Sequence, residues 1–189
     1  TLAVVVSSNE PLLFLTAAWV LGRVAMWFSG ALSPVVVAIA DLAFLPLLAA
    51  FQAPSIVARS AKRNGVFVVI LLALFAANLA VHLEALGIVD GARWGLRLAL
   101  GILVLAITLV GGRIVPAFTQ GGLKAQGIPV AIQPRPRLDV AAILSVALMV
   151  IAEAAGAPAA VVGALAAAAA LAALLRLMCW HGHRTLGVP

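Results

Sequence analysis

The sequence contains little of what a soluble protein uses to face water and to bind its ligands. Charged residues make up 10% of its 189 residues, tyrosine is absent, and cysteine occurs only once, as Cys179. A single cysteine excludes an internal disulfide and any metal site that is built from several thiolates. So few charges cannot cover a water-exposed surface, because soluble domains carry about 25% charged residues. These absences favour a chain that is covered by lipid.

Apolar residues account for 65% of the sequence, and the mean hydropathy is +1.22. They fall into long runs separated by glycine, proline, serine and asparagine, and each run has roughly the 20 residues that a membrane-spanning helix needs. We therefore predict an all-α polytopic transmembrane helix bundle, with a single domain over 1–189 that is part of a longer protein. The predicted helices are approximately 11–29, 34–57, 66–86, 95–115, 138–155 and 158–178.

Acidic residues are also scarce, with six Asp and Glu against 12 Lys and Arg and a net charge of +6. The basic residues lie between apolar spans rather than along one amphipathic face, so we expect no nucleic-acid partner and use them to assign topology. Two, Arg93 and Arg97, fall on one side of the membrane. Nine fall on the other side, together with the N-terminus, which predicts that both ends are cytoplasmic: Arg59, Lys62, Arg63, Arg113, Lys124, Arg135, Arg137, Arg176 and Arg184.

Two opposite charges lie inside the first two predicted helices, at similar depth. Arg23 is on the first helix and Asp41 is on the second, which runs in the opposite direction. A charge near the middle of a membrane helix costs about 2.5–3.5 kcal/mol on insertion scales, so a pair would remove two such costs. The pattern favours a structural ion pair of Arg23 with Asp41 over a catalytic pair.

The third predicted helix carries Asn78 and His82, which share a face because they are four residues apart. A histidine at this depth can bind a metal or haem, and the alternative is a histidine that hydrogen-bonds to a neighbouring helix. Residue counting places Arg23, Asp41, Asn78, His82 and Glu153 in the same half of the bilayer, so we expect a polar layer there.

Two further stretches offer ligands. Gly111 and Gly112 let a helix or a flat ligand approach the backbone, Arg113 can reach a phosphate or carboxylate, and Pro116 is expected to end the helix. The alternative is an interfacial helix end with an arginine that extends to water. Near the C-terminus, Cys179, His181 and His183 could bind copper or zinc, or could form a basic cap at the interface.

The stretches GGRIVPAFT from Gly111, DLAFLPLL from Asp41 and ANLAVH from Ala77 resemble the NnrS family of polytopic membrane proteins. The resemblance covers essentially the whole chain. It implies a haem- and copper-containing protein of the bacterial inner membrane that takes part in the nitric oxide or nitrosative stress response.

Within that resemblance, His82 is the implied metal ligand with Asn78 orienting it. Gly111, Gly112 and Arg113 are the implied contacts of a haem b, with Arg113 near a propionate. The implied partners are the lipid bilayer, the remaining helices of the full-length protein and nitric oxide. An alternative function is a proton- or ion-coupled transporter that uses the buried Arg, Asp, His and Glu layer. The sequence leaves open whether the protein is an enzyme.

Overall fold

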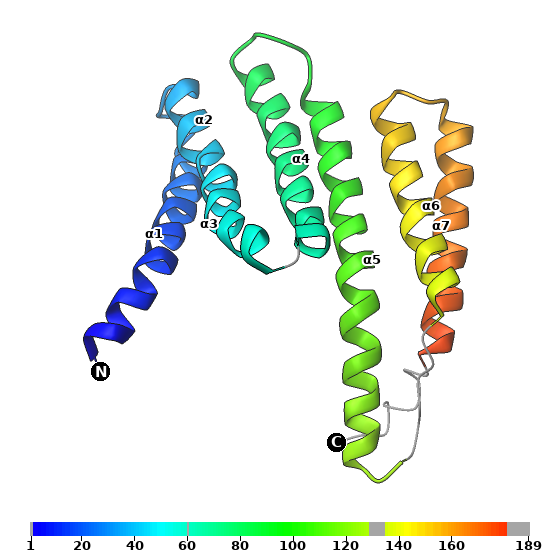
Figure 1. Cartoon of the computed structure of the whole chain (residues 1–189). Coiled ribbons are helices and arrows are strands. Elements are labelled where there is room, and N and C mark those ends of the chain that lie inside the picture. Colours follow the sequence, from blue (N-terminus) through cyan, green and yellow to red (C-terminus); the bar gives the residue numbers. More distant parts are fainter. Residues whose placement is uncertain (1, 60, 129–134, 181–189) are drawn as a thin grey trace. The chain divides into compact units, whose positions relative to one another are not determined.

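The computed structural model describes residues 2–59, 61–128 and 135–180, and all regular structure in these ranges is α-helical (Figure 1). This confirms the predicted fold class. The helices divide between two compact units, Thr1–Ala99 and Leu100–Pro189, and α5 contributes to both. In chain order they are α1 (Leu2–Trp27), α2 (Pro34–Leu42), α3 (Phe44–Arg59), α4 (Ala61–Ala85), α5 (Ala92–Ala125), α6 (Pro136–Ala154) and α7 (Ala159–Cys179).

The helices expose many large apolar side chains, which lipid or further membrane helices can cover favourably. Phe118 is 76% exposed and Ile107 is 70% exposed, and many other large apolar side chains are exposed in both units. Four helical segments among the described residues are long and apolar enough to cross a membrane: Pro34–Gln52, Gly65–Ala85, Ala92–Ala125 and Ala159–Cys179. The chain is therefore a multi-pass membrane protein, and four of the six predicted spans are recovered by length and composition.

The second predicted helix, 34–57, consists of two helices that meet at Ala43. Ser33 caps α2 through its hydroxyl, and the helix ends at Leu42. Pro46 has no backbone N–H, so the carbonyl of Leu42 loses the partner that it would have in a continuous helix. The sequence contained this signal in Pro46, but apolar length alone had suggested an unbroken span.

The predicted end of the fourth helix at 115 is wrong, because α5 continues through Pro116 to Ala125. Proline removes one backbone hydrogen bond and crowds the carbonyl four residues earlier, which here belongs to Gly112. A glycine adjusts its backbone most readily at such a point. The remaining helix-forming residues then carry α5 onward, as is common for prolines in membrane helices.

Small residues bring the helices of the first unit into close contact. α1 packs on α2 and α3, and α4 packs on both α2 and α3. A Cβ atom added to Gly22 of α1 would lie 3.1 Å from the Cα atom of Asp41, so glycine permits this approach. The start of α5 approaches α4 in the same way, since a side chain at Gly95 would collide with the carbonyl of Ala77, which is fully buried. These close contacts surround the polar residues of α2 and α4.

In the second unit, α6 and α7 lie side by side and run in opposite directions (Figure 1). They are joined by a tight turn at Gly156, whose φ of 72° is in the left-handed region that glycine adopts without strain. Gly101 of α5 packs against Val150 of α6, because an added Cβ atom would lie 2.8 Å from the valine Cγ2 atom. The first part of α5 in this unit is thereby fixed to α6.

Candidate functional site

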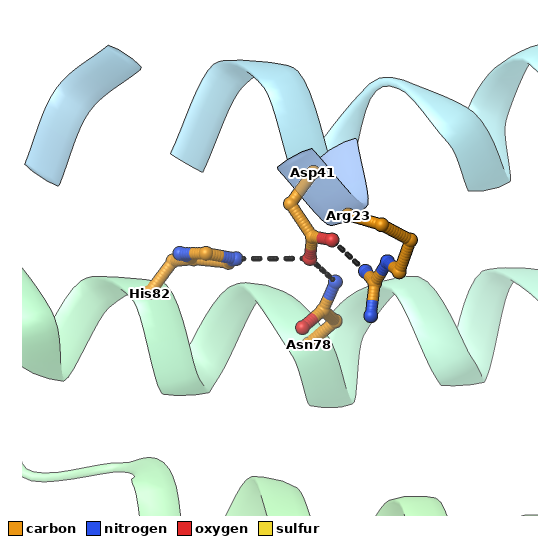
Figure 2. A network of polar contacts seen from close by, with 4 residues as sticks. All are labelled: Arg23, Asp41, Asn78 and His82. Carbon is orange, nitrogen blue, oxygen red and sulfur yellow. Dashed lines mark hydrogen bonds and ion pairs between the residues drawn. The ribbon is translucent and has the colours of Figure 1, made fainter. Parts of the chain in front are cut away.

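The first unit contains a cluster of four polar side chains centred on Asp41. Its Oδ1 atom accepts a hydrogen bond from Arg23, and its Oδ2 atom accepts one of 2.6 Å from Asn78 Nδ2. The Nε2 atom of His82 lies 3.1 Å from the same Oδ2 atom. Figure 2 shows the carboxylate of Asp41 between the imidazole of His82 and the guanidinium of Arg23, with the amide of Asn78 below it.

Helix geometry explains why these side chains converge. Asn78 and His82 are one turn apart on α4 and therefore share one face, which α2 contacts. Asp41 lies in the last turn of α2, before the break at Ala43. Gly22, beside Arg23, allows α1 to approach α2 closely enough for the arginine to reach the carboxylate. The cluster thus depends on backbone positions of three helices.

Burial makes Asp41 the centre of the cluster. The Asp41 side chain is 2% exposed and that of His82 is 5% exposed, whereas the Arg23 side chain is 53% exposed. The positive charge of Arg23 balances the negative charge of Asp41, so the cluster carries no net charge when His82 is neutral. A neutral imidazole that donates from Nε2 to Asp41 keeps its lone pair on Nδ1. This nitrogen is the one available to a ligand.

The structure brings Arg23, Asp41, Asn78 and His82 together, and it gives Asn78 a different partner from the one expected. Asn78 donates to Asp41 and not to His82, so the carboxylate is the group that holds the imidazole. Sequence reasoning had joined Asp41 to Arg23 only, because depth along a helix can be counted while its rotation cannot. Glu153 belongs to the second unit.

A second polar cluster, centred on Arg176 of α7, was not recognised in the sequence. The Arg176 side chain is 6% exposed, and its Nε atom donates a 2.5 Å hydrogen bond to Asp139 Oδ1 of α6. Its Nη1 atom donates a 2.9 Å hydrogen bond to the carbonyl of Thr108 on α5, and its Cζ atom lies 5.0 Å from the centre of the Trp180 ring. One side chain therefore ties the three helices of the unit together.

This cluster changes the interpretation of the two glycines of α5. The guanidinium of Arg176 lies so close to Gly112 that a Cβ atom there would collide with it, whereas an added Cβ atom at Gly111 meets nothing within 4 Å. The close approach that the sequence predicted at Gly112 is made by an arginine of α7. Arg113 is exposed and lines a cavity of about 280 Å³ together with Arg176 and Trp180.

The side chains that could ligate a metal form only part of a ligand set. Among the described residues, no group of three or more His, Cys, Asp and Glu side chains is placed to hold a metal ion. His82 offers a single nitrogen whose ring is already oriented by a carboxylate, which suits one ligand of a larger set. Cys179 lies at the end of α7, and His181 and His183 are outside the described residues.

The fold and this site define a class: a multi-pass helical membrane protein with a buried carboxylate shared by arginine, asparagine and histidine. Comparison with known families gives a more specific assignment. The chain belongs to the NnrS family, because the family model described as NnrS protein matches residues 4–189. No curated protein and no solved structure shows a significant match to the chain. The resemblance noted in the sequence is thus confirmed over nearly its whole length.

Proposed function

We propose that this chain is part of a haem b- and copper-containing protein of the bacterial inner membrane that acts in the response to nitric oxide. In this proposal His82 supplies one ligand to the metal centre, and the remaining ligands come from other helices of the full-length protein. Family membership supports the general role, and the contact of 3.1 Å between His82 Nε2 and Asp41 Oδ2 supports the residue assignment.

The contact matters because histidines that bind metals nearly always donate their second ring nitrogen to a carboxylate, a carbonyl or a water. Such a partner fixes the tautomer and the orientation of the ring and raises the basicity of the free nitrogen. Asp41 has the geometry of this partner for His82. A bound haem would supply the affinity for a diatomic gas, while the helices would supply polarity and access.

Arg23 and Asn78 support His82 indirectly in this proposal. Both donate to Asp41, so the carboxylate is held from two directions besides the imidazole. Arg23 also balances the charge of Asp41, which keeps an anion in the membrane without requiring His82 to be protonated. The imidazole can then stay neutral, as a metal ligand must be.

Metal and haem content of the purified full-length protein tests the proposal. His82→Ala should lose most of its haem or copper, with a weaker Soret absorbance. Asp41→Asn should lose less haem or copper than His82→Ala. The His82 ring loses its charged partner in this variant, but its Nδ1 atom is still present as a ligand. The double variant His181→Ala with His183→Ala is the matched control and should retain its content. Unchanged stoichiometry in folded His82→Ala would reject the ligand assignment.

A proton- or ion-coupled transporter is the second candidate. It is favoured by a chain of contacts that leads from an exposed charged side chain to buried ones. The Arg23 side chain is half exposed and contacts Asp41, which in turn contacts His82. Buried acids and histidines in contact also mark proton paths in membrane proteins. A colourless full-length protein that shows pH-gradient-dependent uptake in proteoliposomes, lost in Asp41→Asn, would support the transporter and contradict the haem proposal.

A further inference from the structure

We infer that the second unit contains a binding site for an anionic phospholipid, where the C-terminal end of α7 meets the N-terminal end of α6 and the middle of α5. The phosphate binds beside Arg113 and Arg135, and an acyl chain lies in an adjoining apolar groove. This inference is independent of the proposed role of His82.

The polar part of the site is the cavity of about 280 Å³, whose lining includes Arg113, Gln120, Arg135, Asp139, Arg176 and Trp180. Three arginines and one aspartate therefore line a single space. Asp139 is paired with Arg176, which leaves the charges of Arg113 and Arg135. In the part of the chain that the structure describes, neither of these two arginines has an ion-pair partner.

The sequence shows that no other acidic side chain of this unit can neutralise them. Asp139 and Glu153 are the only acidic residues in 100–189, and the segments 129–134 and 181–189 contain none. Glu153 is 14 residues after Asp139 on the same helix, which is about 21 Å at a rise of 1.5 Å per residue. The two positive charges are exposed and are therefore open to an anion that is not a side chain of this unit.

The apolar part of the site is a second cavity of about 640 Å³ that adjoins the first. Its lining includes Leu138, Leu175 and Met178, with Arg137 as a further basic residue, and it shares Arg135, Leu138 and Cys179 with the polar cavity. Met178 is 70% exposed, so this groove opens to the surroundings of the helices. A ligand that fills both spaces must be an anion with an attached apolar chain.

Membrane phospholipids have this chemistry and surround the protein at high concentration. Arginine binds phosphate oxygens in a bidentate manner, and basic pockets between membrane helices bind acidic headgroups. Trp180 lies at the end of α7, where indole rings occupy the headgroup region. Free phosphate would satisfy the charges of Arg113 and Arg135 but would leave the apolar groove unused.

Lipid binding to the full-length protein tests the inference. The double variant Arg113→Gln with Arg135→Gln should bind phosphatidylglycerol at least about tenfold more weakly in native mass spectrometry than the wild type does, which corresponds to about 1.4 kcal/mol. Lys124→Gln also removes an exposed positive charge of α5, but Lys124 lines neither cavity, so this control should bind normally. Met178→Trp should weaken lipid binding by filling the groove.

Each remaining outcome overturns the inference. Equal binding by wild type and by the arginine double variant would show that the two charges are not used. Thermal stabilisation by inorganic phosphate equal to that by phosphatidylglycerol, unaffected by Met178→Trp, would show a free-anion site instead. Loss of haem from the arginine double variant with unchanged lipid binding would assign the arginines to a haem propionate.

Discussion

Gly112 and Arg176 are separated by most of the second unit in the sequence, yet the guanidinium of Arg176 occupies the space where a side chain of residue 112 would be. The arginine is buried and bonded to Asp139 and to the carbonyl of Thr108. Glycine at 112 therefore leaves room for a charged side chain from α7 in the position that the structure shows. The GGR motif accordingly has a packing role in addition to any contact with a ligand.

Gly112→Ala should destabilise the second unit. The added methyl group displaces the guanidinium from its contacts with Asp139 and the carbonyl of Thr108, and because Asp139 is 34% exposed we expect this loss to cost about 1–3 kcal/mol. Gly111→Ala is the matched control, since its Cβ atom meets nothing within 4 Å and alanine favours a helix by about 0.5–1 kcal/mol. Thermal unfolding in detergent measures both, and equal melting temperatures for the two variants would contradict the packing role.

Asp41→Leu should be more harmful than Arg23→Leu. Loss of Asp41 removes the partner of Arg23, Asn78 and His82 at once, whereas Arg23 is 53% exposed and its loss leaves the carboxylate bonded to the other two. The double variant Arg23→Leu with Asp41→Leu should cost less than the sum of the single changes, because no charge is left unpaired. Additive losses of folded yield would show that the two residues are not coupled.

Asn78→Asp should destabilise the first unit by at least about 2 kcal/mol, more than Asn78→Leu. The change keeps the shape of the side chain but replaces the donor that lies 2.6 Å from Asp41 Oδ2 with an acceptor. Two carboxylates would then face each other at hydrogen-bond distance in a buried position. Chemical denaturation of the two variants measures the difference, and a more stable Asn78→Asp would mean that Asn78 does not donate to Asp41.

The proposed topology places the turns at Asp90 and Ala157 outside the cytoplasm and the turn at Gln126 inside. In a Cys179→Ser background, an impermeant thiol reagent should label Asp90→Cys and Ala157→Cys in intact cells and should leave Gln126→Cys unlabelled until the membrane is opened. The expectation rests on the distribution of positive charge, with nine basic residues on one side and two on the other. Labelling of Gln126→Cys but not of Asp90→Cys and Ala157→Cys in intact cells would show that the topology is the opposite of the predicted one.

Helix positions were largely predictable because length and apolar composition are local properties. The predicted spans 138–155 and 158–178 differ from α6 and α7 by one or two residues at each end. The effect of each proline on its helix was harder to predict. It depends on whether the surroundings compensate for the backbone hydrogen bond that proline cannot donate. Pro46 accompanies a break in the predicted span 34–57, whereas Pro116 lies inside α5.

The contacts within each cluster could be predicted only in part. Matched depth in the membrane predicted that Arg23 pairs with Asp41, and the four-residue spacing predicted that Asn78 and His82 share a face. That Asp41 also contacts Asn78 and His82 could not be predicted, because it depends on how each helix is rotated about its own axis. Rotation leaves a weak signal in a membrane helix, because the faces toward lipid and toward protein are both apolar. For the same reason, nothing near Arg176 distinguished a buried arginine from an interfacial one.

Because the chain is synthesised from the N-terminus, the two polar clusters are completed at different stages of synthesis. Arg23 precedes Asp41 in the chain, so the counter-ion of the aspartate is already synthesised when α2 follows, and α4 adds its asparagine and histidine afterwards. Asp139 instead precedes Arg176 by nearly the whole of the last helical pair. The second unit therefore completes its polar interior only when α7 has been inserted, and a nascent chain that stops before α7 holds a carboxylate without its partner.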